Sequence, residues 1–382
     1  MSESYLSGSQ PLFPEGLAFA RPTIEEAPSM LQDLADVFAS GILTDGPFVR
    51  RLESAVADRF GVEHCVAVSS CTTGLMLVLR ALGGSSVSLP SFTFSATGHA
   101  ALWNEMEPRF ADCDRETWCL EPAQDLSGDV IVGVHISGVP CPVSDLEKVA
   151  ASTGADLVFD AAHGAGSLVT VDGDTRLLGG FGLAEVFSLT PTKVLSGAEG
   201  GLVTTNDGNL AEEVRVGRNY GNPGDYDTRF AGLNARLSEP HAVVALHSLA
   251  RLEERVDARN MLAERYRQNL GDLPGIGFQA VPDGARSSYK DFTITVDAER
   301  FGVTRDQMAE VLAREGIDTR RYYDPPLHRQ TAYRSWAEEV QLPVTERLAG
   351  RVLTLPMWSH LEARAVDQVS SALRLIHEQR AS

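Results

Sequence analysis

Two segments of the sequence end in residues with complementary chemistry. The segment 186–193 ends in Lys193, just before a glycine-rich turn at residues 197–201. The apolar segment 157–160 ends in Asp160. A lysine amine can form a Schiff base with an aldehyde and later act as a base. An aspartate can hold a protonated ring nitrogen, so the pair predicts a site for pyridoxal 5'-phosphate (PLP), with Lys193 as the catalytic residue.

Each of these residues also has an ordinary explanation. An aspartate after a strand is a good helix N-cap, and most lysines are solvated surface residues. Chemistry is favoured because Ser188 and the glycines that flank Lys193 serve no purpose around a surface lysine. His163, three residues after Asp160, can pack over the cofactor ring or bind its phenolic oxygen, although a lone histidine is usually structural.

The segment 69–74 joins a predicted strand to a predicted helix. Its residues Ser70, Cys71 and Thr72 offer hydroxyls and backbone N–H groups at a helix N-terminus, which suits a phosphate. Alone, this pattern is equally an ordinary helix cap. Ser188 can supply a further hydroxyl. After the next strand come Phe92 and Phe94, of which we expect one to pack in the core and the other to stack on a planar cofactor.

These residues need a scaffold of strands that alternate with helices. Strands are predicted at 65–68, 87–89, 130–135, 157–160, 186–188 and 202–205, with helices at 72–82, 95–103 and 144–151. This order predicts a mostly parallel sheet with helices on both faces, and the short loop before the last strand allows an antiparallel pair there. A long helical pattern covers 238–270. We expect a large domain at 1–254 and a smaller α+β domain at 255–382.

Composition narrows the class of protein. The chain has 382 residues and a net charge of −19, which argues against nucleic acid or an anionic membrane as a partner. Five cysteines without a C-x-x-C pair argue against a metal site or a disulfide framework. The polar residues 1–10 lack a signal-peptide pattern, so a cytoplasmic location is expected. No G-x-G-x-x-G follows the first predicted strand, which disfavours a dehydrogenase.

Taken together, the order and spacing of these motifs resemble the DegT–DnrJ–StrS family of PLP-dependent sugar aminotransferases along nearly the whole chain. The resemblance rests on residues 44–47, 68–72, 90–97, 160–163, 188–193, 218–221, 232–237, 323, 326–328 and 353–357. It implies the aspartate aminotransferase type I fold, an α/β architecture with a mostly parallel seven-stranded sheet flanked by helices and a smaller C-terminal α+β domain. Cys71 departs from the pattern, since glycine is usual there.

The resemblance also implies an activity and partners. Lys193 would make the protein an aminotransferase, because a branch of the family that has histidine at this position performs dehydration instead. The expected amino donor is L-glutamate or L-glutamine, and the expected acceptor is a keto-sugar on a nucleoside diphosphate. A keto-cyclitol acceptor and a non-catalytic PLP-fold regulator are the alternatives. A homodimer with shared sites is implied, in which Asn219 reaches the neighbour's phosphate.

Four further residues are substrate-binding candidates under this resemblance: Thr44, Arg236, Tyr323 and His328. Arg236 is the candidate for the carboxylate of the amino donor. The basic and aromatic loop 320–323 can meet a phosphorylated acceptor, or it can be a solvated surface loop. Other PLP reactions, such as desulfuration, remain open on this fold, because a fold does not fix a function.

Overall fold

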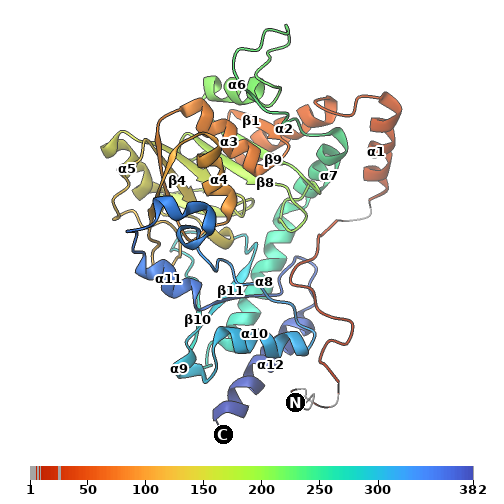
Figure 1. Cartoon of the computed structure of the whole chain (residues 1–382). Helices are drawn as coiled ribbons and strands as arrows, with labels where there is room; N and C mark the ends of the chain where they lie inside the picture. The colour runs from red at the N-terminus through yellow and green to blue at the C-terminus, as the bar shows by residue number, and fades with distance from the viewer. Residues whose placement is uncertain (1–5, 7, 9, 25–26, 382) are drawn as a thin grey trace.

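A seven-stranded sheet forms the centre of the larger part of the computed structural model, which describes residues 6, 8, 10–24 and 27–381 (Figure 1). The strand order is β1-β9-β8-β5-β4-β2-β3. Only β9 runs antiparallel to its neighbours β1 and β8. The strands are β1 (His64–Val68), β2 (Ser86–Pro90), β3 (Glu107–Ala111), β4 (Val130–Val134), β5 (Asp156–Asp160), β8 (Ala184–Ser188) and β9 (Gly201–Thr205).

The predicted mostly parallel sheet and its antiparallel pair are therefore confirmed. The strands β2, β4, β8 and β9 are buried along their whole length. This explains why they read as short apolar runs rather than as alternating patterns. Strand β3 and the separate hairpin of β6 (Leu168–Val171) and β7 (Asp174–Leu177) were not predicted. Their segments, which read EPRFA, LVTV and DTRL, mix polar with apolar residues.

Helices cover both faces of the sheet, and each face has its own hydrophobic core. One core contains residues of α3 (Cys71–Leu82), α4 (Ser95–Trp103) and α6 (Gly208–Gly217). The other contains residues of α2 (Pro47–Phe60), α5 (Val143–Thr153), α7 (Glu239–Ala250) and the start of α8 (Leu252–Leu270). Helix α1 (Pro28–Ser40) lies against α7. Proline begins α1 and α2, and a left-handed glycine ends each of them.

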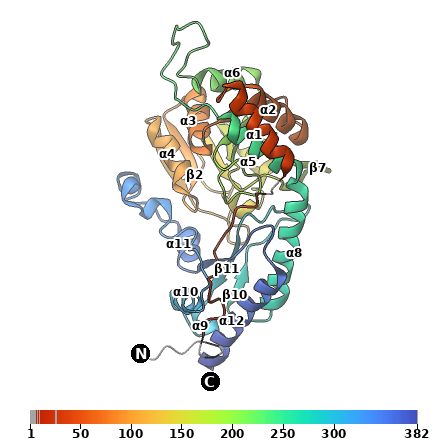
Figure 2. The same cartoon turned by 90° about the vertical axis from the view of Figure 1, so that its right-hand side faces the viewer.

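A second, smaller sheet lies below the first in Figure 1. Its antiparallel strands are β10 (Ile276–Phe278), β11 (Phe292–Val296) and β12 (Val352–Leu355). The helices of this region are α9 (Ala298–Phe301), α10 (Arg305–Arg314), α11 (Pro343–Ala349) and α12 (Ala363–Ala381). The N-terminal segment crosses to this region, where Leu17 bridges to Ile317 and joins the core (Figures 1 and 2). The division at residue 254 stays a prediction.

The long helical pattern at 238–270 forms two helices rather than one. Helix α7 ends at Ala250 and α8 begins at Leu252, with Arg251 between them in a non-helical conformation. Helix α8 then connects the two regions, because Val256 packs in the core of the large sheet and Tyr266 in that of the small sheet. The apolar spacing continues across Arg251, so the periodicity alone does not reveal the break.

Among the described residues, no helix is long and apolar enough to cross a membrane. The expected absence of a signal peptide rests on residues 1–10, of which residues 1–5, 7 and 9 lie outside the described residues. In the loop after α6, residues 221–231 project beyond the large sheet in both views (Figures 1 and 2).

Candidate active site

A pocket of about 280 Å³ opens where the parallel strands of the large sheet end. Ligands of open α/β sheets bind at this edge, because the loops after the strands converge there. All residues predicted to bind the cofactor except Asn219 line this pocket, and so does Tyr323. The lining residues are Ser70, Cys71, Thr72, Thr93, Phe94, Ala96, Val134, Asp160, Ala162, His163, Ser188, Thr190, Thr192, Lys193, Lys290, Tyr322 and Tyr323.

Asp160 is the last residue of β5 and is 4% exposed. Thr97 Oγ1 donates a hydrogen bond of 2.7 Å to Oδ2, and the backbone N–H of Ala162 donates one of 3.0 Å to Oδ1. These two donors orient the carboxylate within the pocket wall. A carboxylate held in this way can accept a hydrogen bond from a protonated ring nitrogen.

Lys193 and His163 face the same pocket. Burial and, to a lesser extent, the charge of Lys290 lower the pKa of Lys193 to about 8. Burial, Lys193 and Lys290 together hold the pKa of His163 well below its usual value. The backbone N–H of Ser137 donates to Nδ1 of His163 at 3.1 Å. His163 is therefore neutral, with its proton on Nε2.

The first turn of α3 forms the hydroxyl-rich end of the pocket. The side chain of Ser70 caps the helix by accepting a hydrogen bond from the N–H of Thr73 at 3.1 Å. Ser188, at the end of β8, lies across the pocket and is 5% exposed. Helix N-termini attract anions, because their first N–H groups have no partner within the helix. This end of the pocket therefore suits a phosphate.

Cys71 is the first residue of α3 and points into the core below the pocket. Its Sγ donates to the carbonyl of Val186 at 3.4 Å and lies 3.8 Å from Oδ1 of Asp160. Burial and the charge of Asp160 raise the pKa of this thiol well above its usual value. The cysteine is therefore accommodated as a small buried side chain in its protonated form.

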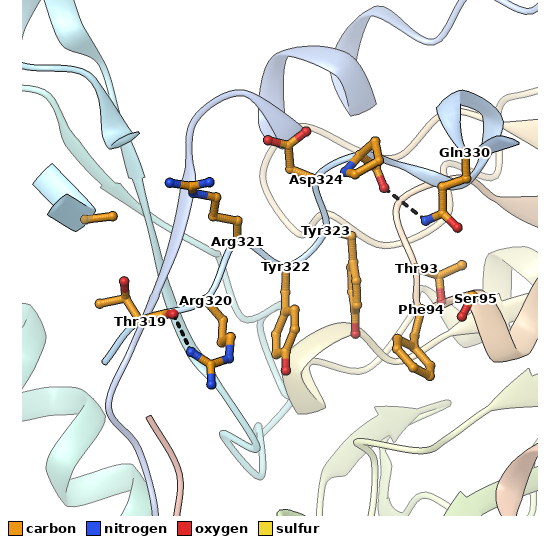
Figure 3. A pocket seen from close by; sticks show the side chains of 12 residues that line it. Thr93, Phe94, Ser95, Thr319, Arg320, Arg321, Tyr322, Tyr323, Asp324 and Gln330 are labelled. Atoms are coloured by element: carbon orange, nitrogen blue, oxygen red, sulfur yellow. Dashed lines mark hydrogen bonds between the residues drawn. The ribbon is translucent and has the colours of Figure 1, made fainter. Parts of the chain in front are cut away.

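Aromatic rings form one wall of the pocket. Phe94 is 60% exposed and lies with its ring centroid 6.5 Å from that of Tyr323, whereas Phe92 is fully buried. The prediction that one phenylalanine is core and the other faces the site agrees with this arrangement. Tyr322 and Tyr323 stack with centroids 5.2 Å apart. Figure 3 shows the rings of Tyr322, Tyr323 and Phe94 in a row.

Three predicted site residues, Thr44, Asn219 and Arg236, lie outside this pocket. Thr44 is exposed and donates from its hydroxyl to the carbonyl of Leu237 at 3.1 Å. Arg236 donates to Oδ1 of Asn219 at 2.8 Å. The backbone of Arg236 bridges to Val68, the last residue of β1, which leads into the segment 69–74 (the predicted phosphate loop). Their predicted contacts with a substrate or cofactor stay predictions.

The structure buries His328 away from the pocket as well. Its Nδ1 lies 2.6 Å from Oγ of Ser91, and its Nε2 lies 3.1 Å from Glu346. The contacts from Ser91 to His328 and from His328 to Glu346 resemble those of the Ser–His–acid triad of hydrolases. However, Ser91 is fully buried and does not line the pocket that contains Lys193. Through these two contacts His328 connects the residue after β2 with α11, so it joins the two regions of the structure.

Among the residues at the site that were not predicted from the sequence, Thr97 and Lys290 contact or face its charged groups. Thr97 lies in the first turn of α4, where its spacing to Phe94 gives no hint of a contact with Asp160. Lys290 lies just before β11 and enters the pocket from the smaller region. The one sequence signal for it is an adjacent pair of opposite charges, Lys290 and Asp291, directly before an apolar strand.

These residues fit PLP. A desolvated amine, an oriented carboxylate and a helix N-terminus face one pocket, and each matches a different functional group of that cofactor. Lys193 would hold the aldehyde, Asp160 the ring nitrogen, and Ser70, Thr72 and Ser188 the phosphate. Among the residues that the structure describes, no group of histidine, cysteine or acidic side chains is arranged to hold a metal ion.

Comparisons with known proteins show the family of this chain. The model of the DegT/DnrJ/EryC1/StrS aminotransferase family matches residues 25–374. The spore coat polysaccharide biosynthesis protein SpsC of Bacillus subtilis is 30% identical over 367 residues, which cover 90% of this chain and 93% of SpsC.

Two solved structures extend the comparison. The structure of DesI in the presence of its TDP-sugar product has a TM-score of 0.90 and 36% identity, and the match covers 98% of this chain and 97% of DesI. A putative PLP-dependent aminotransferase from Bacillus cereus has a TM-score of 0.85 and 25% identity, with 94% of this chain and 100% of that chain covered. The chain belongs to the DegT/DnrJ/EryC1/StrS aminotransferase family and is a PLP-dependent aminotransferase.

Proposed function

We propose that the protein transfers an amino group from L-glutamate or L-glutamine to a keto-sugar carried on a nucleoside diphosphate. The observation that carries the proposal is the meeting of Lys193 and Asp160 in one pocket, beside a second open pocket. The likeness to DesI, whose structure was determined with its TDP-sugar product, supports the class of acceptor. The net reaction exchanges the amine of the donor for the carbonyl oxygen of the acceptor.

Three residues of the pocket have proposed parts in this reaction: Lys193, Asp160 and His163. When bound, PLP supplies an aldehyde and an electron-withdrawing ring. The free amine of Lys193 takes the proton from the α-carbon of the donor and returns a proton to the carbon that receives the amino group. Asp160 would stabilise positive charge on the ring nitrogen of the bound cofactor. The neutral His163 packs beside these groups without adding a charge.

The second pocket suits the nucleotide part of the acceptor. It has a volume of about 430 Å³ and shares Thr93, Phe94, Tyr322 and Tyr323 with the first pocket. Arg320 and Arg321 stand at its rim, where they point away from each other (Figure 3). Their present partners, Asp318 and Asp306, form exposed ion pairs that contribute little and that a diphosphate can replace.

A homodimer with shared sites is part of the proposal. Three features support it. Helix α1 exposes Leu31 and Phe38, which are 61% and 65% exposed. Tyr220 is 50% exposed beside Asn219. Nε of Arg236 is buried without a hydrogen-bond partner among the described residues. A second copy would cover the apolar side chains and would bring its own Asn219 and Arg236 to this site.

The dimer can be tested through helix α1. Phe38→Glu places a charge in the proposed interface, so we expect monomers by analytical ultracentrifugation and loss of bound PLP. Trp103→Glu, on the exposed end of α4 with Trp103 73% exposed, is the control and leaves the mass unchanged. A dimeric Phe38→Glu variant with full PLP would contradict the assignment of this face.

A cytoplasmic location is also proposed. All five cysteines are buried and free, which suits a reducing compartment. Measuring the fraction of the protein in the cytoplasm of its own organism tests this assignment.

The reaction itself is tested with absorbance spectra of the purified protein. L-glutamate should shift the absorption band of bound PLP, and a TDP-linked keto-sugar should restore it. Borohydride should fix the cofactor to Lys193, and Lys193→Ala should abolish the spectral change. If glutamate and glutamine both leave the band unchanged, the transfer reaction is wrong. Restoration by a keto-cyclitol alone would replace the nucleotide-sugar acceptor with the alternative.

A further inference from the structure

Lys290 is a second lysine in the pocket, and the chain contains few lysines. Only Lys148, Lys193 and Lys290 occur among its 33 basic residues, so the other 30 are arginines. Lys148 lies on the surface of α5, with its side chain 74% exposed. The remaining two line the same pocket. A buried lysine is rare, since burial of an ammonium group costs free energy unless the charge is paired.

The position of Lys290 is set by three neighbours. Its Nζ donates to Oδ1 of Asp291 at 2.7 Å, and the two side chains are 4% and 3% exposed. The ammonium also lies 5.6 Å from the ring centroids of Phe19 and Tyr322. Cation–π contacts of this length favour the charged form. The buried amine of Lys290 therefore lies in an ion pair with Asp291 and against two aromatic rings.

Lys193, in contrast, needs its amine unprotonated. Only the neutral amine can attack an aldehyde or take a proton from a carbon atom. A positive charge in the same pocket opposes protonation of that amine, whereas the surrounding acids favour it. The titratable groups that face Lys193 are Asp160 after β5, His163 in the following loop, Cys71 on α3, Lys290 and Asp291 before β11, and Tyr322 and Tyr323 in the loop after α10.

We propose that Lys290, held in the pocket wall by Asp291, is a positioning residue that keeps the amine of Lys193 unprotonated by placing a second positive charge beside it. The proposal adds a role to the aminotransferase site and rests on the proposed use of Lys193. The electrostatics of the pocket also favour the neutral form of the Lys193 amine. After burial, the charge of Lys290 is the largest influence that lowers the pKa of Lys193, and it exceeds the opposing influence of Asp291.

The low number of lysines makes a direct test possible. The full chain, with the cofactor removed, is labelled with trace acetic anhydride across neutral to alkaline pH. Peptide mass spectrometry then gives the titration of each lysine amine, with the exposed Lys148 as an internal reference. In the unmodified protein, the midpoint for Lys193 should fall near the pKa of about 8.

Three variants separate charge from structure. Lys290→Arg keeps the positive charge and should leave the Lys193 midpoint close to that of the unmodified protein. Lys290→Met removes the charge and should raise the midpoint by about one pH unit. The double variant Lys290→Met/Asp291→Asn avoids an unpaired buried carboxylate and should still show a smaller upward shift. The midpoint for Lys148 should not move in any variant.

The outcomes distinguish this proposal from the proposed function. An unmoved Lys193 midpoint in Lys290→Met overturns the proposal. So does a return to the original midpoint in the double variant, because the effect would then belong to Asp291 alone. A higher KM for the donor without any change in the midpoint overturns it too, since Lys290 would then be a carboxylate contact. Failure of the proposed function gives a different result. In that case, adding PLP would not protect Lys193 from labelling.

Discussion

The hydroxyl of Thr97 donates a 2.7 Å hydrogen bond to Oδ2 of Asp160, although the two residues are 63 positions apart in the chain. Thr97 lies in α4 after β2, and Asp160 ends β5. A second bond, from the N–H of Ala162 to Oδ1, leaves the carboxylate little freedom to rotate. Asp160, which is expected to hold the cofactor ring, is therefore oriented by α4, the helix that connects β2 to β3.

Thr97→Val removes this bond and leaves the shape of the side chain nearly unchanged. Because a buried bond to a charged group contributes about 1.5–3 kcal/mol, we expect a loss of similar size in the free energy of unfolding. We also expect weaker binding of PLP. Denaturation in urea and a PLP titration measure both. Thr97→Ser is the matched control, since it keeps the hydroxyl, and equal losses in the two variants would refute the role of the bond.

Gly201 permits the close approach of β9 to the phosphate loop. A Cβ atom at this position would lie 2.5 Å from the N atom of Cys71 and from the carbonyl carbon of Ser70. Gly201→Ala must therefore displace the start of α3, at a cost of about 1–3 kcal/mol. We expect a marked rise in the dissociation constant of PLP. Gly208→Ala, where the nearest atom is a side-chain nitrogen at 3.3 Å, should bind PLP normally.

Lys193 makes the stability of the cofactor-free chain depend on pH. Its pKa is lowered from 10.5 to about 8 in the folded state, so the folded chain binds fewer protons than the unfolded chain between these values. The cost to stability is therefore complete below about pH 8 and disappears above about pH 10.5. Its upper limit is about 3 kcal/mol, and pocket water reduces it.

Lys193→Met should consequently stabilise the cofactor-free chain at neutral pH by about 1–3 kcal/mol. The difference from the unmodified chain should vanish at strongly alkaline pH. Urea denaturation at both pH values measures it. A Lys193→Met chain that is less stable at neutral pH would show that the lysine stem, rather than the amine, dominates the local packing.

Cys71 should be chemically inert in the folded protein. Its raised thiol pKa leaves almost no thiolate at neutral pH, and the thiolate is the reactive form. We expect iodoacetamide to modify Cys71 only after unfolding, as followed by peptide mass spectrometry. Cys71→Gly should retain the bound PLP. Rapid modification of Cys71 in the native protein would instead indicate that the phosphate loop opens.

Much of the site could be predicted from the sequence because its residues follow strands. Ser70, Asp160, Ser188 and Lys193 each lie at or soon after the end of a short apolar segment. Strands that alternate with helices run parallel, so their carboxyl ends meet at one edge of the sheet. Local order along the chain thus determined which groups would converge.

Other features depended on contacts between distant segments. Lys290 enters the pocket from the smaller region, and no local pattern indicates that the segment before β11 reaches the edge of the large sheet. The burial of His328 against Ser91 and Glu346 likewise joins segments of both regions. A motif reports the type of side chain, whereas its burial and partners depend on how the two regions pack.

The sequence by itself determined the chemical identity of the site: a lysine, an aspartate and a hydroxyl-rich helix start at the ends of successive strands. The tertiary structure alone decided the protonation state of the lysine in that site. The protonation of Lys193 depends on desolvation and on the charges of Lys290 and Asp291, about 100 residues away along the chain. Such through-space interactions leave no periodic or local trace in the sequence.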